Sequence, residues 1–208
     1  DILIDQNFKR KKNDYKNLVP KKCKILAGIN YAIIRDEFLK IKKNRIKKDY
    51  ILISLGNYDP NFATYKCLKE VLQKETGFKI IVIVSIKSQS YNKIKELQNL
   101  YTFKIFSDID YIAKLMNKSF ISIGAGGSTS WERCFMGLPT IVVKLANNQN
   151  FIIKELVRSK ISYYAGNIKS NHLNISQGID YFLNKKNYNM SIKNSKKLID
   201  GLGKKRIL

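Results

Sequence analysis

The chain has 208 residues, of which 44% are hydrophobic, 26% are charged and 11% are aromatic. This composition supports a hydrophobic core and excludes a disordered chain, and no apolar run approaches the roughly 18 residues of a membrane span. The N-terminal segment has neither the basic start nor the apolar stretch of a signal peptide. We therefore expect a cytoplasmic protein of one domain, with or without an appendage.

Basic residues outnumber acidic residues by 39 to 16, which gives a formal net charge of +23. Such an excess is typical of proteins that bind nucleic acid or an anionic membrane surface. Only six of the basic residues are arginine, which nucleic-acid sites favour, and the lysines are spread over every segment. We interpret the charge as a solvated lysine surface and predict no nucleic-acid partner. A basic nucleic-acid-binding module remains the alternative.

The first 48 residues differ from the rest of the chain. Residues 1–6 are predicted to form a strand, a Lys-rich loop follows, residues 14–38 contain the breakers Pro20 and Gly28, and a basic helix extends to about Lys48. Because the strand begins abruptly and without an initiator Met, we expect a fragment. Residues 1–48 are predicted to be the remnant of an N-terminal domain with its interdomain connector, and residues 49–208 a nucleotide-binding domain.

From residue 49 onward, short apolar runs alternate with segments of helical period, which is typical of βα units. The apolar runs are rich in Ile and Val, as strands covered on both faces are. Strands are predicted over residues 50–55, 79–85, 103–106, 119–123, 139–144 and 161–164, and helices over 61–76, 90–101, 108–118, 128–137, 148–158, 173–184 and 187–199. The predicted fold class is α/β, a Rossmann-like parallel sheet with helices on both faces.

A glycine loop over residues 124–130, GAGGSTS, lies between a predicted strand and a predicted helix. Glycines allow a ligand to approach the backbone closely, and the N–H groups at the start of a helix bind anionic oxygens. The loop therefore predicts a phosphate site, although it lacks the Lys of a P-loop and departs from G-x-G-x-x-G at Thr129. The alternative is a tight connection without a ligand.

Two further polar loops follow predicted strands. Residues 54–60, SLGNYDP, follow the strand that ends near residue 55, and residues 145–150, LANNQN, follow the strand that ends near residue 144. Ligands of open parallel sheets bind outside the carboxyl ends of the strands, so we expect these loops to flank one crevice with the glycine loop. Amides suit sugar hydroxyls. The alternatives are a simple turn at the first loop and an Asn-rich composition at the second.

Single residues whose side chains could bind a ligand or react give weaker predictions of a site. Glu132 lies about one turn into the helix after the glycine loop, where it is placed to accept hydrogen bonds from ribose hydroxyls, to stabilise the helix dipole or to pair with a Lys. The lone His172 is predicted to be a surface or capping residue, and no catalytic triad or carboxylate pair is apparent. Cys23, Cys67 and Cys134 lack metal-ligand spacing, so we expect small buried residues, no metal and no cofactor.

Eight blocks of residues in one order carry a family resemblance. They are DILIDQN (1–7); DY and LVP with Cys23 and Gly28 (14–28); YA with Arg35, Glu37 and Phe38 (31–38); LISLG with Asp59 and Pro60 (52–60); GAGGST with WERC (124–134); GLP (137–139); LA with NQ (145–149); and DGLG (200–203). Together they resemble the C-terminal part of the UDP-sugar hydrolases of pseudaminic acid biosynthesis, which are relatives of two-domain GT-B glycosyltransferases such as MurG.

The resemblance implies the C-terminal domain of a GT-B-type fold that binds a UDP-sugar substrate and pairs with a missing N-terminal domain. The implied reaction is metal-independent hydrolysis of a UDP-linked 2,4-diacetamido-2,4,6-trideoxyhexose at the anomeric carbon, which releases UDP and free sugar. The implied contacts are Gly126, Gly127, Ser128 and Thr129 with the diphosphate, Glu132 with the ribose, the backbone near Ile109 with the uracil, Asn148 and Gln149 with the sugar end, and Gly56 and Asn57 in the first loop.

This sequence departs from the family pattern at two places. The general base of the family is a His in an N-terminal Gly-x-Gly-His loop, which is absent here, so the catalytic residue is unknown and we expect binding without hydrolysis by this chain alone. The first loop reads Gly56-Asn57-Tyr58-Asp59 where relatives carry Gly-Gly-Ser-Asp. The alternative enzyme is a GT-B glycosyltransferase that uses the same UDP site. The exact sugar and the oligomeric state stay open.

Overall fold

The computed structural model describes residues 1–41, 47–57, 59–170 and 172–208. Within these ranges one sheet has the strand order β5–β4–β3–β6–β7–β8, and all neighbouring strands are parallel. Its strands are β3 (Tyr50–Ser54), β4 (Lys79–Ile83), β5 (Lys104–Phe106), β6 (Ser119–Ala125), β7 (Thr140–Lys144) and β8 (Ser162–Asn167). Each lies where the sequence predicts a strand, which confirms the parallel α/β fold.

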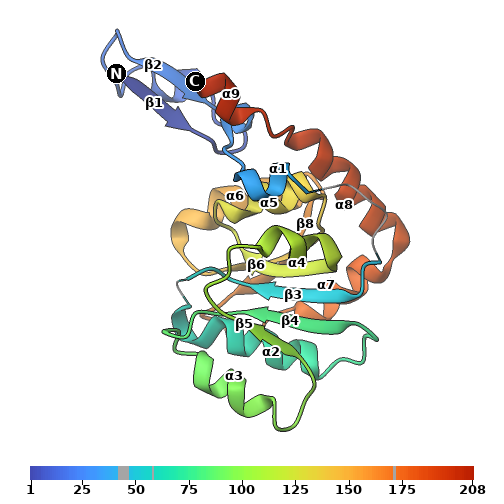
Figure 1. Cartoon of the computed structure of the whole chain (residues 1–208). Coiled ribbons are helices and arrows are strands. Elements are labelled where there is room, and N and C mark those ends of the chain that lie inside the picture. The colour runs from blue at the N-terminus through green and yellow to red at the C-terminus, as the bar shows by residue number, and fades with distance from the viewer. Residues whose placement is uncertain (42–46, 58, 171) are drawn as a thin grey trace.

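Helices cover both faces of this sheet (Figure 1). One face carries α2 (Ala63–Leu72), α3 (Tyr91–Leu97) and α7 (Ile175–Leu183), and the other carries α4 (Ile112–Lys118), α5 (Thr129–Met136) and α6 (Asn150–Arg158). The long helix α8 (Lys185–Leu198) packs against α5 and α7. Strand β3 shows why helices cover both faces of the sheet. Its side chains alternate between the faces and are apolar on both, so that Ile51 and Ile53 belong to one hydrophobic core and Leu52 belongs to the other.

The strand order reverses its direction between β3 and β6. From β3 the chain adds β4 and β5 on one side, and β6, β7 and β8 then extend the sheet on the other side. This is the order 3-2-1-4-5-6 of doubly wound sheets, in which ligands bind outside the carboxyl ends of the strands at the reversal point. The fold therefore places the loops after Ser54 and Ala125 beside each other.

The N-terminal segment forms a small sheet of its own, which projects from one end of the molecule (Figure 1). Strands β1 (Ile2–Asp5) and β2 (Lys24–Ala27) pair in parallel, and η1 (Lys12–Tyr15), η2 (Ile29–Tyr31) and α1 (Asp36–Leu39) complete the segment. The C-terminal helix α9 (Gly203–Ile207) packs against η2, where Arg206 Nη1 donates a hydrogen bond to the Asn30 carbonyl at 2.9 Å.

Several element boundaries differ from the sequence predictions. Neither β2 nor α9 was predicted, because four or five residues give too little periodicity to recognise. The predicted helix over 61–76 divides into η3 (Pro60–Phe62) and α2, since Phe62 has a φ of 56°. The helix predicted from residue 108 begins at Ile112. Residues 42–46 of the predicted basic helix, and Tyr58 and Asn171, lie outside the described residues.

Candidate functional site

A pocket of about 180 Å³ lies outside the carboxyl ends of β3 and β4. The residues that line it include Gly56 and Asn57 of the first polar loop, Ile109 before α4, Ile112 as the first residue of α4, and Thr129 at the start of α5. We call it the Ile109 pocket. Apolar side chains and polar loop backbone together suit a flat heterocycle that needs both stacking surface and hydrogen bonds.

A second pocket, of about 200 Å³, adjoins the first at the strand reversal. Gly56, Asn57 and Thr129 line both pockets, whereas Gly127 and Ser128 line only the second. We call it the Gly127 pocket. The structure thus brings the first polar loop and the glycine loop to two adjoining pockets, which we together call the groove, as the parallel-sheet argument predicts.

The N-terminus of α5 presents free hydrogen-bond donors to the Gly127 pocket. Ser128 is the N-cap residue, and its side chain makes no capping hydrogen bond. The amides of Ser130 and Trp131 are satisfied by the carbonyls of Gly127 and Ser128, each at 3.0 Å. Among the described residues the amides of Ser128 and Thr129 have no acceptor. These donors lie at the positive end of the helix dipole, so the geometry suits an anion.

The two adjacent glycines of the loop have different structural roles. A Cβ on Gly127 would meet no atom of the neighbouring described residues within 4 Å, so this part of the structure leaves the pocket open above it. A Cβ on Gly126 would collide with Ile153 of α6, coming within 2.8 Å of its Cδ1 atom. Gly126 is buried and lines neither pocket. Packing against α6 therefore explains the glycine at 126, and open space above the backbone accompanies the glycine at 127.

Asp59 fixes the loop that follows β3. Its side chain is 7% exposed, and Oδ1 accepts hydrogen bonds from the Thr64 amide at 2.8 Å and the Thr64 hydroxyl at 3.0 Å. The Ser88 hydroxyl donates a hydrogen bond to Oδ2. These bonds join the loop to α2 and to the connection after β4, so Gly56 and Asn57 are held at the rim of both pockets.

Glu132 pairs with Arg35 rather than with a lysine. Arg35 donates from Nε to Oε1 at 2.6 Å and from Nη2 to Oε2 at 3.0 Å, and this hydrogen bonding raises the pKa of Arg35 above its usual value. Glu132 is 7% exposed and lines neither pocket, whereas Arg35 lines the Ile109 pocket. Each carboxylate oxygen keeps a second lone pair, so the pair leaves acceptor capacity for a hydroxyl group.

The two predicted amide side chains of the loop over residues 145–150 occupy different places. Gln149 lines the Gly127 pocket, and its Oε1 accepts a hydrogen bond from the Leu145 amide at 2.9 Å. Asn148 is exposed and lines neither pocket. The structure therefore brings Gln149, but not Asn148, to the groove.

Arg133 lines the Gly127 pocket and was not predicted from the sequence. Its side chain is only 3% exposed, and Nη2 donates to the Ala125 carbonyl at 2.5 Å and to the Ser130 hydroxyl at 2.9 Å. An arginine within a predicted amphipathic helix is usually a surface residue. The available signal was its spacing of four from Thr129, which places both residues on one face of the helix.

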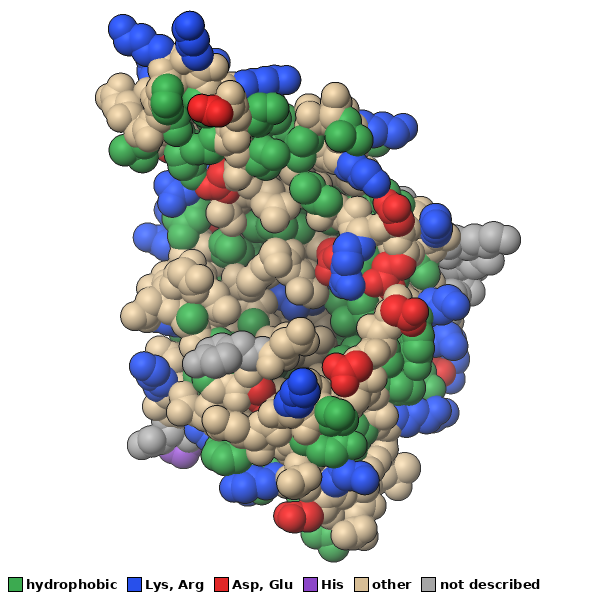
Figure 2. Space-filling model, turned by 60° about the vertical axis from the view of Figure 1, so that its left-hand side comes forward, with side chains coloured by type: hydrophobic (Ala, Val, Ile, Leu, Met, Phe, Trp, Pro, Cys, Tyr) green, Lys and Arg blue, Asp and Glu red, His purple; other side chains and the backbone are tan. Residues whose placement is uncertain are grey.

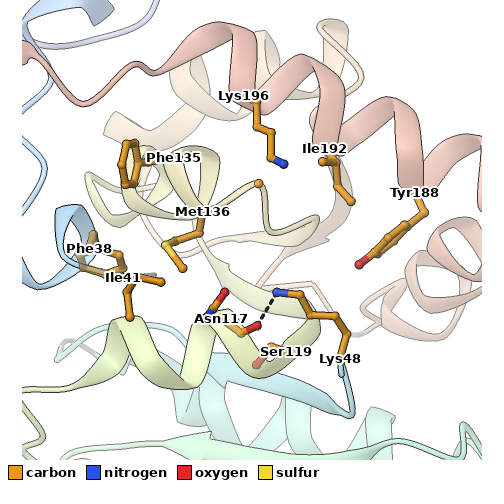
Figure 3. A pocket seen from close by; sticks show the side chains of 11 residues that line it. Phe38, Ile41, Lys48, Asn117, Ser119, Phe135, Met136, Tyr188, Ile192 and Lys196 are labelled. Atoms are coloured by element: carbon orange, nitrogen blue, oxygen red, sulfur yellow. Dashed lines mark hydrogen bonds between the residues drawn. The ribbon is translucent and has the colours of Figure 1, made fainter. Parts of the chain in front are cut away.

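A separate cavity of about 200 Å³ lies at the amino ends of the strands, between Ser119 of β6 and helix α8. Figure 3 shows Lys48 and Lys196 pointing into it from opposite sides. Lys48 donates a hydrogen bond to the Asn117 carbonyl, and burial, reinforced by the charge of Lys196, lowers its pKa. This edge is opposite the reversal-point loops, so the cavity is not part of the groove.

The surface and the remaining single residues partly follow the sequence predictions. Lysine and arginine side chains are scattered singly over the face seen in Figure 2. Cys67 and Cys134 are buried, and burial raises the pKa of both thiols, that of Cys134 to about 12. The prediction of burial is wrong for Cys23, which is half-buried beside the exposed small sheet. His172 is exposed, as predicted.

In the described ranges no helix has the length and apolarity to cross a bilayer.

Two curated proteins are similar to this chain in sequence. An uncharacterised protein of Methanocaldococcus jannaschii, MJ1062, is 32% identical over 176 residues, which are 79% of this chain and 34% of that protein. The UDP-2,4-diacetamido-2,4,6-trideoxy-beta-L-altropyranose hydrolase of Campylobacter jejuni is 34% identical over 121 residues, or 57% of this chain and 43% of that protein. The chain thus spans less than half the length of either relative. No family model matches it.

Solved structures show the same fold at low sequence identity. UDP-GlcNAc 2-epimerase from Neisseria meningitidis, bound to UDP-GlcNAc, aligns with a TM-score of 0.65 and 16% identity over 94% of this chain and 57% of that chain. MurG of Acinetobacter baumannii aligns with a TM-score of 0.60 and 17% identity over 92% of this chain and 56% of that chain. The chain therefore has the Rossmann-like fold of GT-B-type enzymes.

Proposed function

We propose that this chain binds the nucleotide of a UDP-sugar in the groove formed by the Ile109 and Gly127 pockets. The observation that carries the proposal is the pair of free amides at the N-terminus of α5, which lie at the strand reversal beside a pocket of mixed apolar and polar lining. The amides suit the diphosphate, and the Ile109 pocket, which combines apolar side chains with hydrogen-bonding groups, suits the uracil. One curated relative and one structural neighbour support this proposal, because the relative is a UDP-sugar hydrolase and the neighbour was solved with UDP-GlcNAc bound.

The proposed contacts follow from the placement of the residues. Gly127, Ser128 and Thr129 contact the diphosphate, and the backbone near Ile109 contacts the uracil, with Gly56 and Asn57 between them. Glu132 contacts the ribose through its remaining lone pairs, and Gln149 faces the sugar end. Gly126 shapes the loop by packing against α6. Asn148 has the weakest support, because it is exposed and lies outside both pockets, whereas Glu132, also outside them, is bonded to Arg35 of the Ile109 pocket.

The domain division is part of the same proposal. Residues 1–48 belong to a preceding domain and its connector, and residues 49–208 form the nucleotide-binding domain. The small sheet of β1 and β2 supports this division, because Ile2 and Ile4 are 56% and 46% exposed and lack a covering layer. The greater length of both curated relatives supports it as well.

The proposed reaction belongs to the longer protein. It is the hydrolysis of a UDP-linked 2,4-diacetamido-2,4,6-trideoxyhexose, in which donors preorganised around the diphosphate stabilise the departing UDP. The second candidate is sugar transfer to an acceptor by a GT-B glycosyltransferase, which the likeness to MurG favours equally. Incubating the longer protein with the UDP-sugar and no acceptor distinguishes the two. Release of UDP and free sugar is expected, and an intact substrate contradicts the hydrolase.

UDP binding by this chain is the first test of the proposed function. Trp131 is the only tryptophan and is 1% exposed on α5, so its fluorescence reports on the site. We expect saturable binding of UDP at one site and weaker, steeply salt-dependent binding of a nonspecific oligonucleotide. Tight oligonucleotide binding with no response to UDP would instead favour the nucleic-acid-binding module.

A further inference from the structure

The guanidinium of Arg133 is a buried cation beneath the glycine loop. Its Nη2 atom bonds the Ala125 carbonyl and the Ser130 hydroxyl, whereas its Nε atom is buried and makes no hydrogen bond. Burial lowers the pKa of Arg133 to about 10, so the side chain keeps its charge at neutral pH. The loop therefore lies over a permanent positive charge that is incompletely solvated by the protein.

Among the described residues no carboxylate forms an ion pair with this charge, although the nearby carboxylate of Glu132 raises the pKa of Arg133 electrostatically. The acidic neighbour in sequence, Glu132, is engaged by Arg35 through both oxygens, at 2.6 and 3.0 Å. None of the ion pairs in the described part of the chain includes Arg133. A buried charge without a partner is costly unless something else supplies the opposite charge. In its described part the structure thus contains a buried cation without an ion-pair partner, next to the helix terminus that presents free amides.

The local packing opens Arg133 toward the Gly127 pocket. Arg133 lines this pocket together with Gly127, Ser128 and Thr129. A Cβ on Gly124 would collide with Nη1 and come within 2.8 Å of Cζ, so the glycine at 124 makes room for the guanidinium. The cation and the free amides of α5 therefore border the same space.

We propose that Arg133 is a specificity-determining residue whose charge is neutralised by the phosphoryl groups of the bound nucleotide, so that the site selects a nucleoside diphosphate over the nucleoside. This inference rests on the proposed function and adds to it a residue and a source of selectivity. It differs from a purely structural role, in which Arg133 only holds the loop through Ala125 and Ser130. The structural role predicts equal losses for every ligand of the groove.

The test compares UDP, uridine and inorganic pyrophosphate on the 208-residue chain. Arg133→Met removes the charge at similar length, and Arg158→Met removes a charge whose side chain is 66% exposed on α6. We expect Arg133→Met to lower the affinity for UDP and for pyrophosphate by about 10- to 100-fold, as for loss of a charged hydrogen-bond partner. The affinity of Arg133→Met for uridine is expected to change by less than about twofold. The affinities of Arg158→Met for all three ligands are expected to change equally little.

Salt dependence and a second variant complete the test. The Kd of the native chain for UDP is expected to rise more steeply with NaCl than that of Arg133→Met. Arg133→Lys keeps the charge, so it is expected to retain more of the preference for UDP over uridine, and it decides the question if Arg133→Met does not fold. The inference is overturned if the Arg133 variants lose affinity for UDP and uridine equally, or if they lose no affinity for UDP.

The outcome for the native chain separates this inference from the proposed function. If the native chain binds pyrophosphate through Arg133 but binds neither UDP nor uridine, the uridine-nucleotide assignment and the proposed selectivity fail, and only the neutralisation of Arg133 by phosphoryl groups stands. If it binds UDP and the Arg133 variants bind UDP equally well, the proposed function stands and the inference fails. Absence of binding to all three ligands contradicts both.

Discussion

Gly127→Val is expected to raise the Kd for UDP by about 100-fold while leaving the chain folded. A Cβ at this position lies more than 4 Å from the other described residues that could obstruct it, so we expect the side chain to meet the ligand rather than the protein. Displacing a phosphoryl group from the amides of Ser128 and Thr129 forfeits about 3 kcal/mol of charge-assisted hydrogen bonding. Titration followed by Trp131 fluorescence, with a thermal melt of each variant, measures both effects.

The neighbouring glycine provides the matched control for this prediction. Gly126→Ala places a Cβ against Ile153, and we expect this overpacking to lower the free energy of unfolding by about 1–3 kcal/mol. Any UDP binding lost in this variant is expected to accompany the loss of stability. A Gly127→Val chain that binds UDP like the native chain would show that the phosphates lie elsewhere.

Glu132→Ala is expected to weaken UDP binding by about 1–3 kcal/mol, which is the usual value of a hydrogen bond to a charged group. Glu132 is 7% exposed and lies three residues after Thr129 on α5, so both residues share a face of the helix, and we propose that its remaining lone pairs accept from a ribose hydroxyl. Comparison of UDP with its 2′,3′-dideoxyribose analogue measures the contact directly. Native protein is expected to prefer UDP, and the variant is expected to bind both equally.

Two further variants separate a ribose contact from an indirect effect through Arg35. Glu37→Ala removes the other carboxylate that pairs with Arg35, at 3.1 Å from Nη1, and is expected to preserve UDP affinity. If Glu132 acts only by holding Arg35, then Arg35→Met matches Glu132→Ala and the double variant adds nothing. A preference for UDP over the dideoxy analogue that survives in Glu132→Ala would remove Glu132 from the site.

The sequence predicts the sheet and the position of the groove for a physical reason. Strands covered on both faces must be apolar throughout, so β3, β6 and β7 appear as Ile- and Val-rich runs. A glycine loop between a strand and a helix fixes the anion-binding terminus locally, and parallel topology brings the other strand ends beside it. The apolar strands and the glycine loop are both properties of short segments, so the sequence predicts them without knowledge of distant contacts.

The features that the sequence does not predict depend on distant parts of the chain. The partner of Glu132 lies 97 residues away, on a segment whose path no local pattern determines. The glycine at 126 is explained only when Ile153 of α6 is seen packed against it. Arg133 looks like a surface residue until burial and the position of the Ala125 carbonyl are known. Pairing, packing and burial of this kind are properties of the assembled sheet.

The position of a bound uridine nucleotide in a crystal of this chain tests the central claim most directly. We predict that crystals soaked with UDP show the diphosphate within hydrogen-bond distance of the amides of Ser128 and Thr129, with the uracil beside Ile109. A nucleotide bound at any other place, or a Gly127 pocket closed by the protein's own side chains, would contradict the account.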